Sequence, residues 1–510
     1  MERGQRVQIK IDDMTREGQG IGKSEGFAIF VAGAVTGDVV EVELTKVKKN
    51  YAFGRLLEIV ETSPNRIAPM CKYAGDCGGC SLAALDYEGQ LQYKTNLVEG
   101  SLKRLGGLAS PVIREIKGVS DPFRYRNKLT MPISTGGIIT RKGGIVENLG
   151  EATIGFYRAK SHDVIDCDDC LLQSEPAMAA VNAVRQFMEE DNITAYDPKW
   201  DKGLMRHIVV KTAEGTGEVM VVLAVNGKGI PNSEKLVSML DDAIFDIPVY
   251  EDGVEYNLAS VVVNVNKTKD MTGQILGDEC ITIAGKPTIT DTCGDMKFEI
   301  SPLAFYQVNP SQMKVLYDKA IEYANLSGSE TVLDLYCGVG TIGLFAAKKI
   351  NEMNGQGQVI GIESVKGAVL DANRNATING IVNARFICGR VEEELPKLLG
   401  GDSEADLETP EGKEPEADEK TTTLRIEGAD VVFLDPPRTG CDEKLLSAVA
   451  DLAPERIVYV SCDPATLARD IKYLSDHGFE FVENTPVDMF PWSGHVESII
   501  LMTYCGSEEK

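Results

Sequence analysis

Apolar, strand-like runs alternate with helical stretches through the second half of the chain, and this alternation restricts the fold more than any other feature. The runs span residues 332–336, 359–363, 384–388, 430–435, 456–462 and 497–504. Strands separated by helices form a mostly parallel sheet that is covered by its crossover helices. We therefore predict an α/β protein with a C-terminal doubly wound, Rossmann-like sheet over residues 301–510.

A glycine-rich turn follows the first of these runs. Gly338, Gly340 and Gly343 have the spacing G-x-G-x-x-G, and Glu363 stands at the end of the next run. This arrangement is typical of a pocket for a nucleoside cofactor, either NAD or S-adenosylmethionine. Asp334 lies so close to the turn that it would repel a pyrophosphate, whereas it would attract a sulfonium and an amino group. The pattern therefore favours S-adenosylmethionine.

Two later strand ends indicate methyl transfer to a pyrimidine. Residues 434–438 read LDPPR, in which two prolines fix a rigid turn at the strand end where α/β sheets place their ligands. The run 456–462 ends in Cys462 at the same edge. A thiolate that adds to carbon 6 of a pyrimidine turns carbon 5 into a nucleophile that can accept a methyl group.

This chemistry also needs a base that removes the proton from carbon 5. Glu497 starts the final strand, so it could reach the edge that carries Cys462. His495 is the rival base, although a histidine at a loop–strand junction is more often structural. Trp492 could pack on the target base.

Cysteines cluster in the first third of the chain. Cys71, Cys77 and Cys80 lie among glycines that allow a tight loop, and Cys167 or Cys170 could add a fourth thiolate. Four thiolates suit either zinc or an iron–sulfur cluster. The spacing does not separate the two, although its unevenness favours the cluster.

The N-terminal residues have a different pattern. Short alternating runs, such as Val7–Ile11, Phe27–Val31 and Val39–Leu44, are separated by turns. This pattern is typical of a small five-stranded barrel, a fold that often binds oligonucleotides. We predict such a barrel for residues 1–62 and a central α+β domain with the cysteine cluster for residues 63–300.

Charge is distributed unevenly along the chain. The formal net charge of −26 argues against a polyanionic partner, but residues 402–420 hold nine acids and two lysines and are expected to be a disordered insertion. Residues 92–144 hold ten bases and three acids. Within this stretch, residues 123–128 (FRYRNK) could bind RNA phosphates and stack on unpaired bases. The acidic total therefore does not exclude RNA.

Membrane and secretory signals are not found in the sequence. It contains no run of about 18 apolar residues and no N-terminal secretory signal. We expect a cytoplasmic protein that does not contact membranes and is a monomer.

Together, these motifs resemble the RNA 5-methyluridine methyltransferase family. The resemblance is strongest to the branch that has an N-terminal TRAM barrel and a 4Fe–4S cluster and modifies 23S ribosomal RNA. It covers nearly the whole chain and is carried by CKYAGDCGGC (71–80), GFYRAKSHDVIDCDDC (155–170), SPLAFYQVNP (301–310), DLYCGVGTIG (334–343), LDPPRTG (434–440), YVSCDP (459–464) and HVES (495–498).

The resemblance implies an RNA (uracil-5-)-methyltransferase and assigns its site residues. Cys462 would be the nucleophile and Glu497 the proton acceptor. Contacts to S-adenosylmethionine would come from Gln307, Tyr336, Gly338, Glu363 and Asp435. The 4Fe–4S ligands would be Cys71, Cys77, Cys80 and Cys170, with Cys167 as a bystander. A helix near residues 92–120 would pack with the catalytic domain.

Three alternatives remain at this point. A tRNA-directed uracil-5 methyltransferase would have the same catalytic motifs. An NAD-dependent dehydrogenase would explain the glycine turn but not LDPPR, YVSCDP or the cysteine cluster. A non-enzymatic RNA-binding or ribosome-assembly factor would leave the thiol, the acid and the donor pocket without a use.

Overall fold

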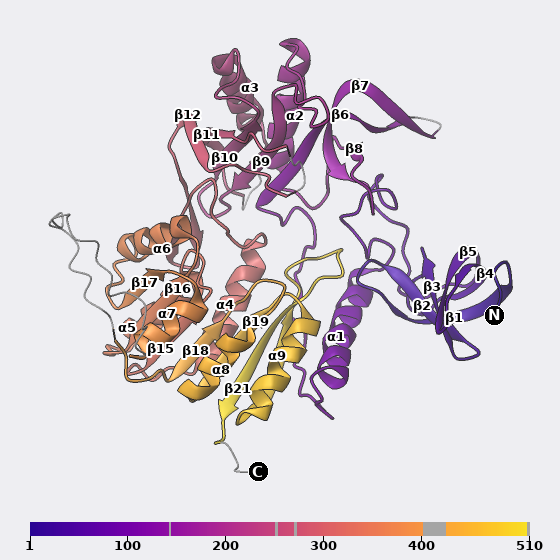
Figure 1. Cartoon of the computed structure of the whole chain (residues 1–510). Coiled ribbons are helices and arrows are strands. Elements are labelled where there is room, and N and C mark those ends of the chain that lie inside the picture. Colours follow the sequence, from indigo (N-terminus) through magenta and orange to yellow (C-terminus); the bar gives the residue numbers. More distant parts are fainter. Residues whose placement is uncertain (142–143, 250–252, 270–272, 401–424, 507–510) are drawn as a thin grey trace, which may run out of the picture. The chain divides into compact units, whose positions relative to one another are not determined.

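The computed structural model describes residues 1–141, 144–249, 253–269, 273–400 and 425–506 (Figure 1). The chain forms two compact units and passes between them several times. Unit 1 comprises Met1–Asn96, Ile116–Lys314 and Asp488–Val496, and unit 2 comprises Leu97–Glu115, Val315–Val487 and Glu497–Lys510. The acidic run 402–420 lies outside the described residues. No helix in the described part of the chain is long and apolar enough to cross a membrane.

Unit 1 begins with a closed barrel, which confirms the fold predicted for the N-terminal residues (Figure 1). Its strands are β1 (Arg6–Met14), β2 (Gln19–Ser24), β3 (Phe27–Ala32), β4 (Val39–Val47) and β5 (Tyr51–Glu61), joined in the order β1-β2-β3-β5-β4. Alternate residues point inward, so Ile9, Ile29, Val31 and Val42 fill the interior. The polar residues between them face outward.

The rest of unit 1 is built on a seven-stranded mixed sheet. Its strands are β6 (Lys128–Arg141), β7 (Gly144–Tyr157), β8 (Val164–Asp166), β9 (Met205–Thr212), β10 (Glu218–Val225), β11 (Asn257–Val265) and β12 (Glu279–Gly285), in the order β12-β11-β10-β9-β6-β7-β8. Helices α2 (Glu175–Glu190) and α3 (Ser233–Phe245) pack side by side against β9, β10 and β11. A short ribbon of β13 (Ile289–Cys293) and β14 (Met296–Ile300) follows.

A buried ion pair fixes the segment Asp488–Val496 within unit 1. Lys94, in helix α1 (Tyr87–Arg104), donates to Asp488 at 2.5 Å and to the carbonyl oxygen of Phe490 at 2.9 Å. Both charged side chains are fully buried. The Tyr87 hydroxyl donates to the second oxygen of Asp488 at 2.9 Å. Removal of one partner would leave a buried, unpaired charge, which usually costs about 3–5 kcal/mol.

Within residues 123–128, Tyr125 and Asn127 are buried in unit 1 and the other four residues are partly exposed. Phe123 stacks on Trp492, with ring centroids 5.1 Å apart, and Tyr125 is 7% exposed. Arg124 forms an ion pair with Asp169 at 2.8 Å. The buried rings of Tyr125 and Trp492 do not offer the open faces to unpaired bases that the sequence predicted, whereas Phe123 is only partly buried.

Unit 2 is a doubly wound sheet, as the alternation of strands and helices predicted. Its strands are β15 (Thr331–Leu335), β16 (Gln358–Glu363), β17 (Ala384–Cys388), β18 (Val431–Leu434), β19 (Arg456–Ser461), β20 (Phe479–Val487) and β21 (Glu497–Tyr504), in the order β17-β16-β15-β18-β19-β21-β20. Strand β21 runs antiparallel to β19 and β20 on either side of it, and the other pairs of this sheet are parallel. Strand β20 was not predicted, because Glu480, Glu483 and Asn484 interrupt its apolar pattern.

The helices of unit 2 form two groups. The helices that lie wholly in unit 2 are α5 (Thr341–Glu352), α6 (Lys366–Ile378), α7 (Val391–Leu398), α8 (Glu443–Leu452) and α9 (Pro464–Asp476). Helix α4 (Pro310–Ala324) begins in unit 1 and ends in unit 2. Helix α5 packs with α6, and α8 packs with α7 and α9. The strand order reverses between β15 and β18, so right-handed crossovers place these groups on opposite faces of the sheet.

Candidate active site and cysteine pocket

The reversal of strand order in unit 2 defines where a ligand can bind. Doubly wound sheets bind ligands outside the carboxyl ends of the strands at this point. Here β15 ends at Leu335 and β18 ends at Leu434, side by side in the sheet. Tyr336 and Gly338 follow the first strand and Asp435 follows the second, so the predicted donor contacts of unit 2 gather at one edge.

The turn after β15 has a backbone conformation that few side chains tolerate. Tyr336, Gly338 and Gly340 all have positive φ angles, of 65°, 55° and 80°. A side chain added at Gly338 would meet no heavy atom within 4 Å, so the turn presents open backbone there. The strained Tyr336 is held by its hydroxyl, which donates to Glu392 at 3.0 Å. Such strain is characteristic of ligand-binding turns.

The third glycine has a packing role. A Cβ atom at Gly343 would lie 2.8 Å from a carboxylate oxygen of Asp334, which accepts a hydrogen bond from the Gly343 N–H at 2.8 Å. Helix α5 can therefore begin directly against β15. Asp334 is 1% exposed, so it could influence a ligand only through its electric field and not by contact.

Acidic groups surround this turn. The Glu363 carboxylate accepts from the Gly338 N–H at 3.2 Å and from the Val365 N–H at 2.8 Å, which fixes it beside the glycines. Burial and the nearby negative charge of Asp334 raise the pKa of Asp435 to about 7. Burial also raises the pKa of Asp334 to about 7, and the charge of Glu363 adds to this rise. A cationic ligand would relieve the repulsion among these carboxyl groups.

Strand pairing brings Cys462 and Glu497 together. Strand β21 runs antiparallel to β19, with Ser461 opposite Ser498. In an antiparallel pair, the residue after Ser461 lies opposite the residue before Ser498. Cys462 and Glu497 are therefore opposite each other, which brings the thiol and the carboxyl group side by side. Cys462 is half-buried, and Glu497 is 4% exposed.

Burial suppresses ionisation of both groups. It raises the pKa of Glu497 to about 8, with a contribution from the negative charge of Asp435. It also raises the pKa of Cys462 to about 11, and the charge of Glu497 contributes to that rise. The positive charge of Arg438 lowers the pKa of both groups. Arg438 stands in the LDPPR motif, but the sequence alone gave no reason to assign it this electrostatic role.

A buried acid holds the loop that carries Arg438. Asp470 accepts hydrogen bonds from the Tyr459 hydroxyl at 2.7 Å and from the Cys441 N–H at 2.8 Å. Its neighbour Arg469 donates to the carbonyl oxygen of Thr439 at 3.0 Å. The turn after β18 is thus tied to α9, which follows Cys462. Nothing in the sequence motif indicated Asp470.

Two candidate residues, Gln307 and His495, belong to unit 1. Gln307 is 7% exposed, and its carbonyl oxygen accepts from the Asn127 side chain at 2.9 Å. His495 lies near Phe490, with ring centroids 6.0 Å apart. The other predicted donor and catalytic residues belong to unit 2.

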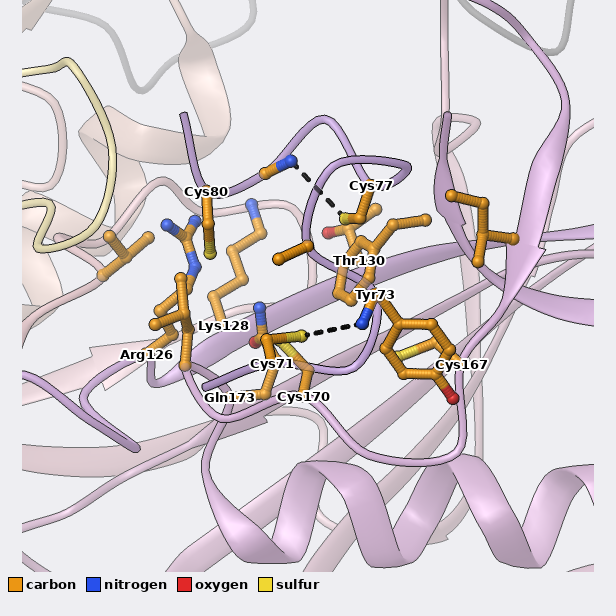
Figure 2. Close-up of a pocket in the computed structure, with 16 residues that line it drawn as sticks. Cys71, Tyr73, Cys77, Cys80, Arg126, Lys128, Thr130, Cys167, Cys170 and Gln173 are labelled. Carbon is orange, nitrogen blue, oxygen red and sulfur yellow. Dashed lines mark hydrogen bonds between the residues drawn. The ribbon is translucent and has the colours of Figure 1, made fainter. Parts of the chain in front are cut away.

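Five cysteines of unit 1 line one cavity of about 410 Å³ (Figure 2). They are Cys71, Cys77, Cys80, Cys167 and Cys170. Backbone N–H groups point at two of the sulfur atoms, from Tyr73 to Cys71 at 3.4 Å and from Gly79 to Cys77 at 3.5 Å. The Cys167 thiol instead donates to the carbonyl oxygen of Asp169 at 3.2 Å. The hydrogen bond therefore ties the Cys167 thiol to a residue of its own loop.

The cavity is electrostatically suited to a cationic centre. Burial raises the pKa of Cys80 to about 12, and the charges of Cys170, Cys77 and Cys71 contribute. Burial likewise raises the pKa of Cys77 and Cys170. Within the described ranges, no three His, Cys, Asp or Glu side chains are placed to hold a single metal ion.

Comparisons with known proteins agree with this geometry. Residues 287–504 match the family model described as tRNA (uracil-5-)-methyltransferase, and residues 1–57 match the TRAM domain. A protein of Caldanaerobacter subterraneus subsp. tengcongensis named as an uncharacterized RNA methyltransferase is 43% identical over 500 residues, covering 98% of both chains. Its counterpart in Clostridium tetani is 42% identical, covering 98% of this chain and 97% of its own.

One solved structure has a similar fold over nearly the whole chain. The tRNA (uracil-54, C5)-methyltransferase of Pyrococcus abyssi, in complex with S-adenosyl-L-homocysteine, is 25% identical with a TM-score of 0.69. The match covers 98% of this chain and 100% of that one. The whole chain, including barrel, central sheet and doubly wound sheet, therefore has a known counterpart.

The raised pKa of Glu497 predicts a pH-dependent stability difference. Because its pKa is about 8 in the folded protein and 4.5 ordinarily, only the folded state holds this proton between those values. Its contribution to stability therefore falls as the pH rises toward 8. Glu497→Gln cannot ionise, so its melting temperature relative to wild type should increase from pH 5 to pH 9. Glu443→Gln, at an exposed carboxyl group, is the control. A difference that stays constant with pH would contradict the prediction.

Proposed function

Because the chain belongs to the RNA uracil-5 methyltransferase family, we propose that it transfers a methyl group from S-adenosylmethionine to carbon 5 of uracil in RNA, with Cys462 as the nucleophile. The observation that carries this proposal is the pairing of Cys462 with Glu497 at the sheet edge that also carries the glycine turn. A thiol, an acid and a nucleoside pocket at one edge are the parts that this chemistry needs.

The donor site is supported by the turn after β15 and the acids around it. Glu363, fixed beside the glycines, is placed to accept hydrogen bonds from ribose hydroxyls. Tyr336 and Asp435 flank the same turn at the ends of neighbouring strands. Gln307 is proposed as a further donor contact on the family resemblance alone. When bound, S-adenosylmethionine supplies an electrophilic methyl group next to a positively charged sulfur, which the acidic surroundings favour.

The chain's residues act in a covalent sequence. The Cys462 thiolate forms a bond to carbon 6 of a uracil flipped into the site, and the displaced electron pair makes carbon 5 nucleophilic. Carbon 5 takes the methyl group, and the donor sulfur keeps the electrons of the bond that breaks. Glu497, directly or through water, removes the proton from carbon 5, and those electrons expel the Cys462 thiolate. The products are 5-methyluracil in RNA, S-adenosylhomocysteine and one proton.

The electrostatics support consecutive use of the two groups. A negative charge on Glu497 raises the pKa of Cys462, so the thiolate forms more readily while Glu497 is protonated. Once sulfur is bonded to carbon 6 it carries no charge, and Glu497 can then ionise and act as a base. Arg438 stabilises the anionic form of each group in turn, because it lowers the pKa of both.

The RNA substrate is proposed to be 23S ribosomal RNA, with tRNA as the second candidate. The first follows from the resemblance of the whole motif set, including the barrel and the cysteine cluster, to the ribosomal branch. The second is favoured by the similarity to the tRNA (uracil-54, C5)-methyltransferase of Pyrococcus abyssi.

The cysteine pocket is proposed to hold a 4Fe–4S cluster on Cys71, Cys77, Cys80 and Cys170. Support comes from the shared cavity, the two N–H groups directed at sulfur and the mutual repulsion of the thiolates. Arg126 and Lys128 line the same cavity and would offset the negative charge of a thiolate-ligated cluster. Its role would be to shape the central domain for RNA binding, because its ligands lie far in the sequence from every catalytic motif.

Substitution of the two catalytic groups should produce opposite effects on a covalent intermediate. Cys462→Ala should abolish both methyl transfer and any covalent adduct with RNA. Glu497→Gln should lower turnover by about 10²–10⁴-fold and accumulate the adduct, because loss of a general base blocks its resolution. Denaturing electrophoresis with labelled RNA measures the adduct. Cys388→Ala, at an exposed thiol at the end of β17, is the matched control and should be fully active. An active Cys462→Ala enzyme would contradict the mechanism.

The choice between the two RNA substrates can be made in cells. Deletion of the gene should remove 5-methyluridine from 23S ribosomal RNA and leave tRNA unchanged, as measured by mass spectrometry of the separated RNA fractions. Loss confined to tRNA would select the second candidate. An unchanged content in both fractions would overturn the proposed activity.

The cluster predicts how individual cysteines affect bound iron. Serine at Cys71, Cys77, Cys80 or Cys170 should reduce iron and acid-labile sulfide in protein purified without oxygen. Serine at Cys167, or at the exposed Cys280 as a control, should leave both contents near four per chain, as a 4Fe–4S cluster requires. Stoichiometric zinc without sulfide would show that the pocket holds a different centre.

A further inference from the structure

Three aromatic rings gather on the outer surface of the N-terminal barrel. The ring centroids of Phe30, Tyr51 and Phe53 are all 5.6–5.9 Å from one another. Strand β3 pairs in parallel with β5, with Phe30 opposite Phe53 and Ala28 opposite Tyr51. The residues between them, Ile29 and Ala52, are fully buried, so the period-two alternation of the strands turns the three rings outward.

The barrel does not use these rings to fill its core. Its interior is occupied by aliphatic side chains of β1, β3, β4 and β5, and none of the three rings packs against that cluster. Tyr51 is 39% exposed, and Phe30 and Phe53 are partly exposed. Exposure of adjoining aromatic rings is unfavourable unless something covers them, so an aromatic surface of this kind indicates a binding site.

Lysines stand on both sides of the rings. Lys46 of β4 is opposite Phe53, and Lys23 of β2 is opposite Ala28, the partner of Tyr51. Lys48 pairs with Tyr51 through its backbone N–H, at 2.8 Å from the Tyr51 carbonyl oxygen. All three lysine side chains are exposed, and none forms an ion pair with any carboxylate of the described ranges.

This combination selects one kind of partner. Exposed rings flanked by unpaired ammonium groups match a strand that has both aromatic faces and phosphates. In single-stranded nucleic acid, bases stack on such rings and phosphates meet such lysines, whereas a paired helix hides the base faces. A protein partner would need acidic side chains that alternate with flat aromatic groups at the same spacing.

We propose that Phe30, Tyr51 and Phe53, with Lys23, Lys46 and Lys48, form a stacking platform for unpaired nucleotides of the RNA substrate. The platform rests on the proposed function, since it would hold the RNA whose uracil reaches Cys462. It assigns to the barrel surface stacking contacts that the buried ring of Tyr125 cannot make.

The platform can be tested with the full-length protein and a fluorescein-labelled single-stranded 12-mer of uridine. Phe30→Leu/Tyr51→Leu keeps apolar bulk but removes two rings, and it should weaken binding about tenfold, since stacking is worth about 1–3 kcal/mol per base. Tyr51→Phe should bind like wild type. Trp200→Leu is the matched control, because Trp200 is 65% exposed with Lys199 over its ring but lies outside the barrel. Equal weakening by the control would overturn the proposal.

The lysines have a separate signature. Lys46→Gln/Lys48→Gln should reduce the slope of log Kd against log salt by about 1.4, because each phosphate contact on a single strand contributes about 0.7. If this variant loses affinity while the leucine variant does not, the surface binds by charge alone and the stacking platform is excluded.

Cross-linking keeps the proposal testable if a variant does not fold. Ultraviolet irradiation of the wild-type complex, followed by mass spectrometry, should locate the uridine adduct on Phe30, Tyr51 or Phe53. Adducts found only elsewhere would overturn the platform. Methylation of extracted RNA by the same wild-type preparation is measured in parallel. Its absence would count against the proposed function, whereas binding and cross-linking report on the platform alone.

Discussion

The antiparallel pairing of β21 with β19 is the constraint on which the candidate active site depends. Parallel strands can bring only their carboxyl ends to the ligand-binding edge of a doubly wound sheet. Strand β21 is reversed, so its first residue, Glu497, arrives at the edge where β19 delivers Cys462. One reversed strand therefore combines an acid and a thiol that lie 35 residues apart. The buried pair of Lys94 and Asp488 holds the segment that precedes this strand within unit 1, so the strand begins from an anchored chain.

Both pockets collect groups that repel one another when ionised. Asp334, Asp435 and Glu497 all have raised pKa values because burial removes water and neighbouring acids oppose a second charge. The thiols around the cysteine cavity have the same relationship. Such an arrangement lowers the free energy of unfolding, and binding of a positively charged centre offsets this loss. A sulfonium at one pocket and iron at the other have that charge, and this common principle supports both proposed ligands.

Elements with strong local periodicity could be predicted from the sequence, whereas long-range packing could not. The barrel and the alternating α/β half follow from short-range alternation and were predicted near their observed bounds. The helix expected near residues 92–120 is instead observed at Tyr87–Arg104. Strand β20 escaped prediction because its polar residues interrupt that alternation. Phe123 stacks on Trp492, which lies 369 residues away, so no local pattern indicated this contact. The positions of Cys462 and Asp435 followed from strand ends, but the influence of Arg438 and Asp470 depends on how a loop folds back on α9.

The distribution of charge explains how an acidic chain can bind a polyanion. The net charge of −26 is a sum over the whole surface, and at physiological ionic strength a charge acts over only about 8 Å. An RNA strand therefore responds to the side chains it touches. Residues 1–70 hold ten acids and ten bases, yet Lys23, Lys46 and Lys48 stand together beside three exposed rings. On the neighbouring part of the barrel, Glu43 is neutralised by its ion pair with Arg55. The net negative charge of the protein repels polyanions in general. A locally basic, aromatic surface therefore favours a nucleic-acid strand whose bases can also stack on the rings, over polyanions that interact through charge alone.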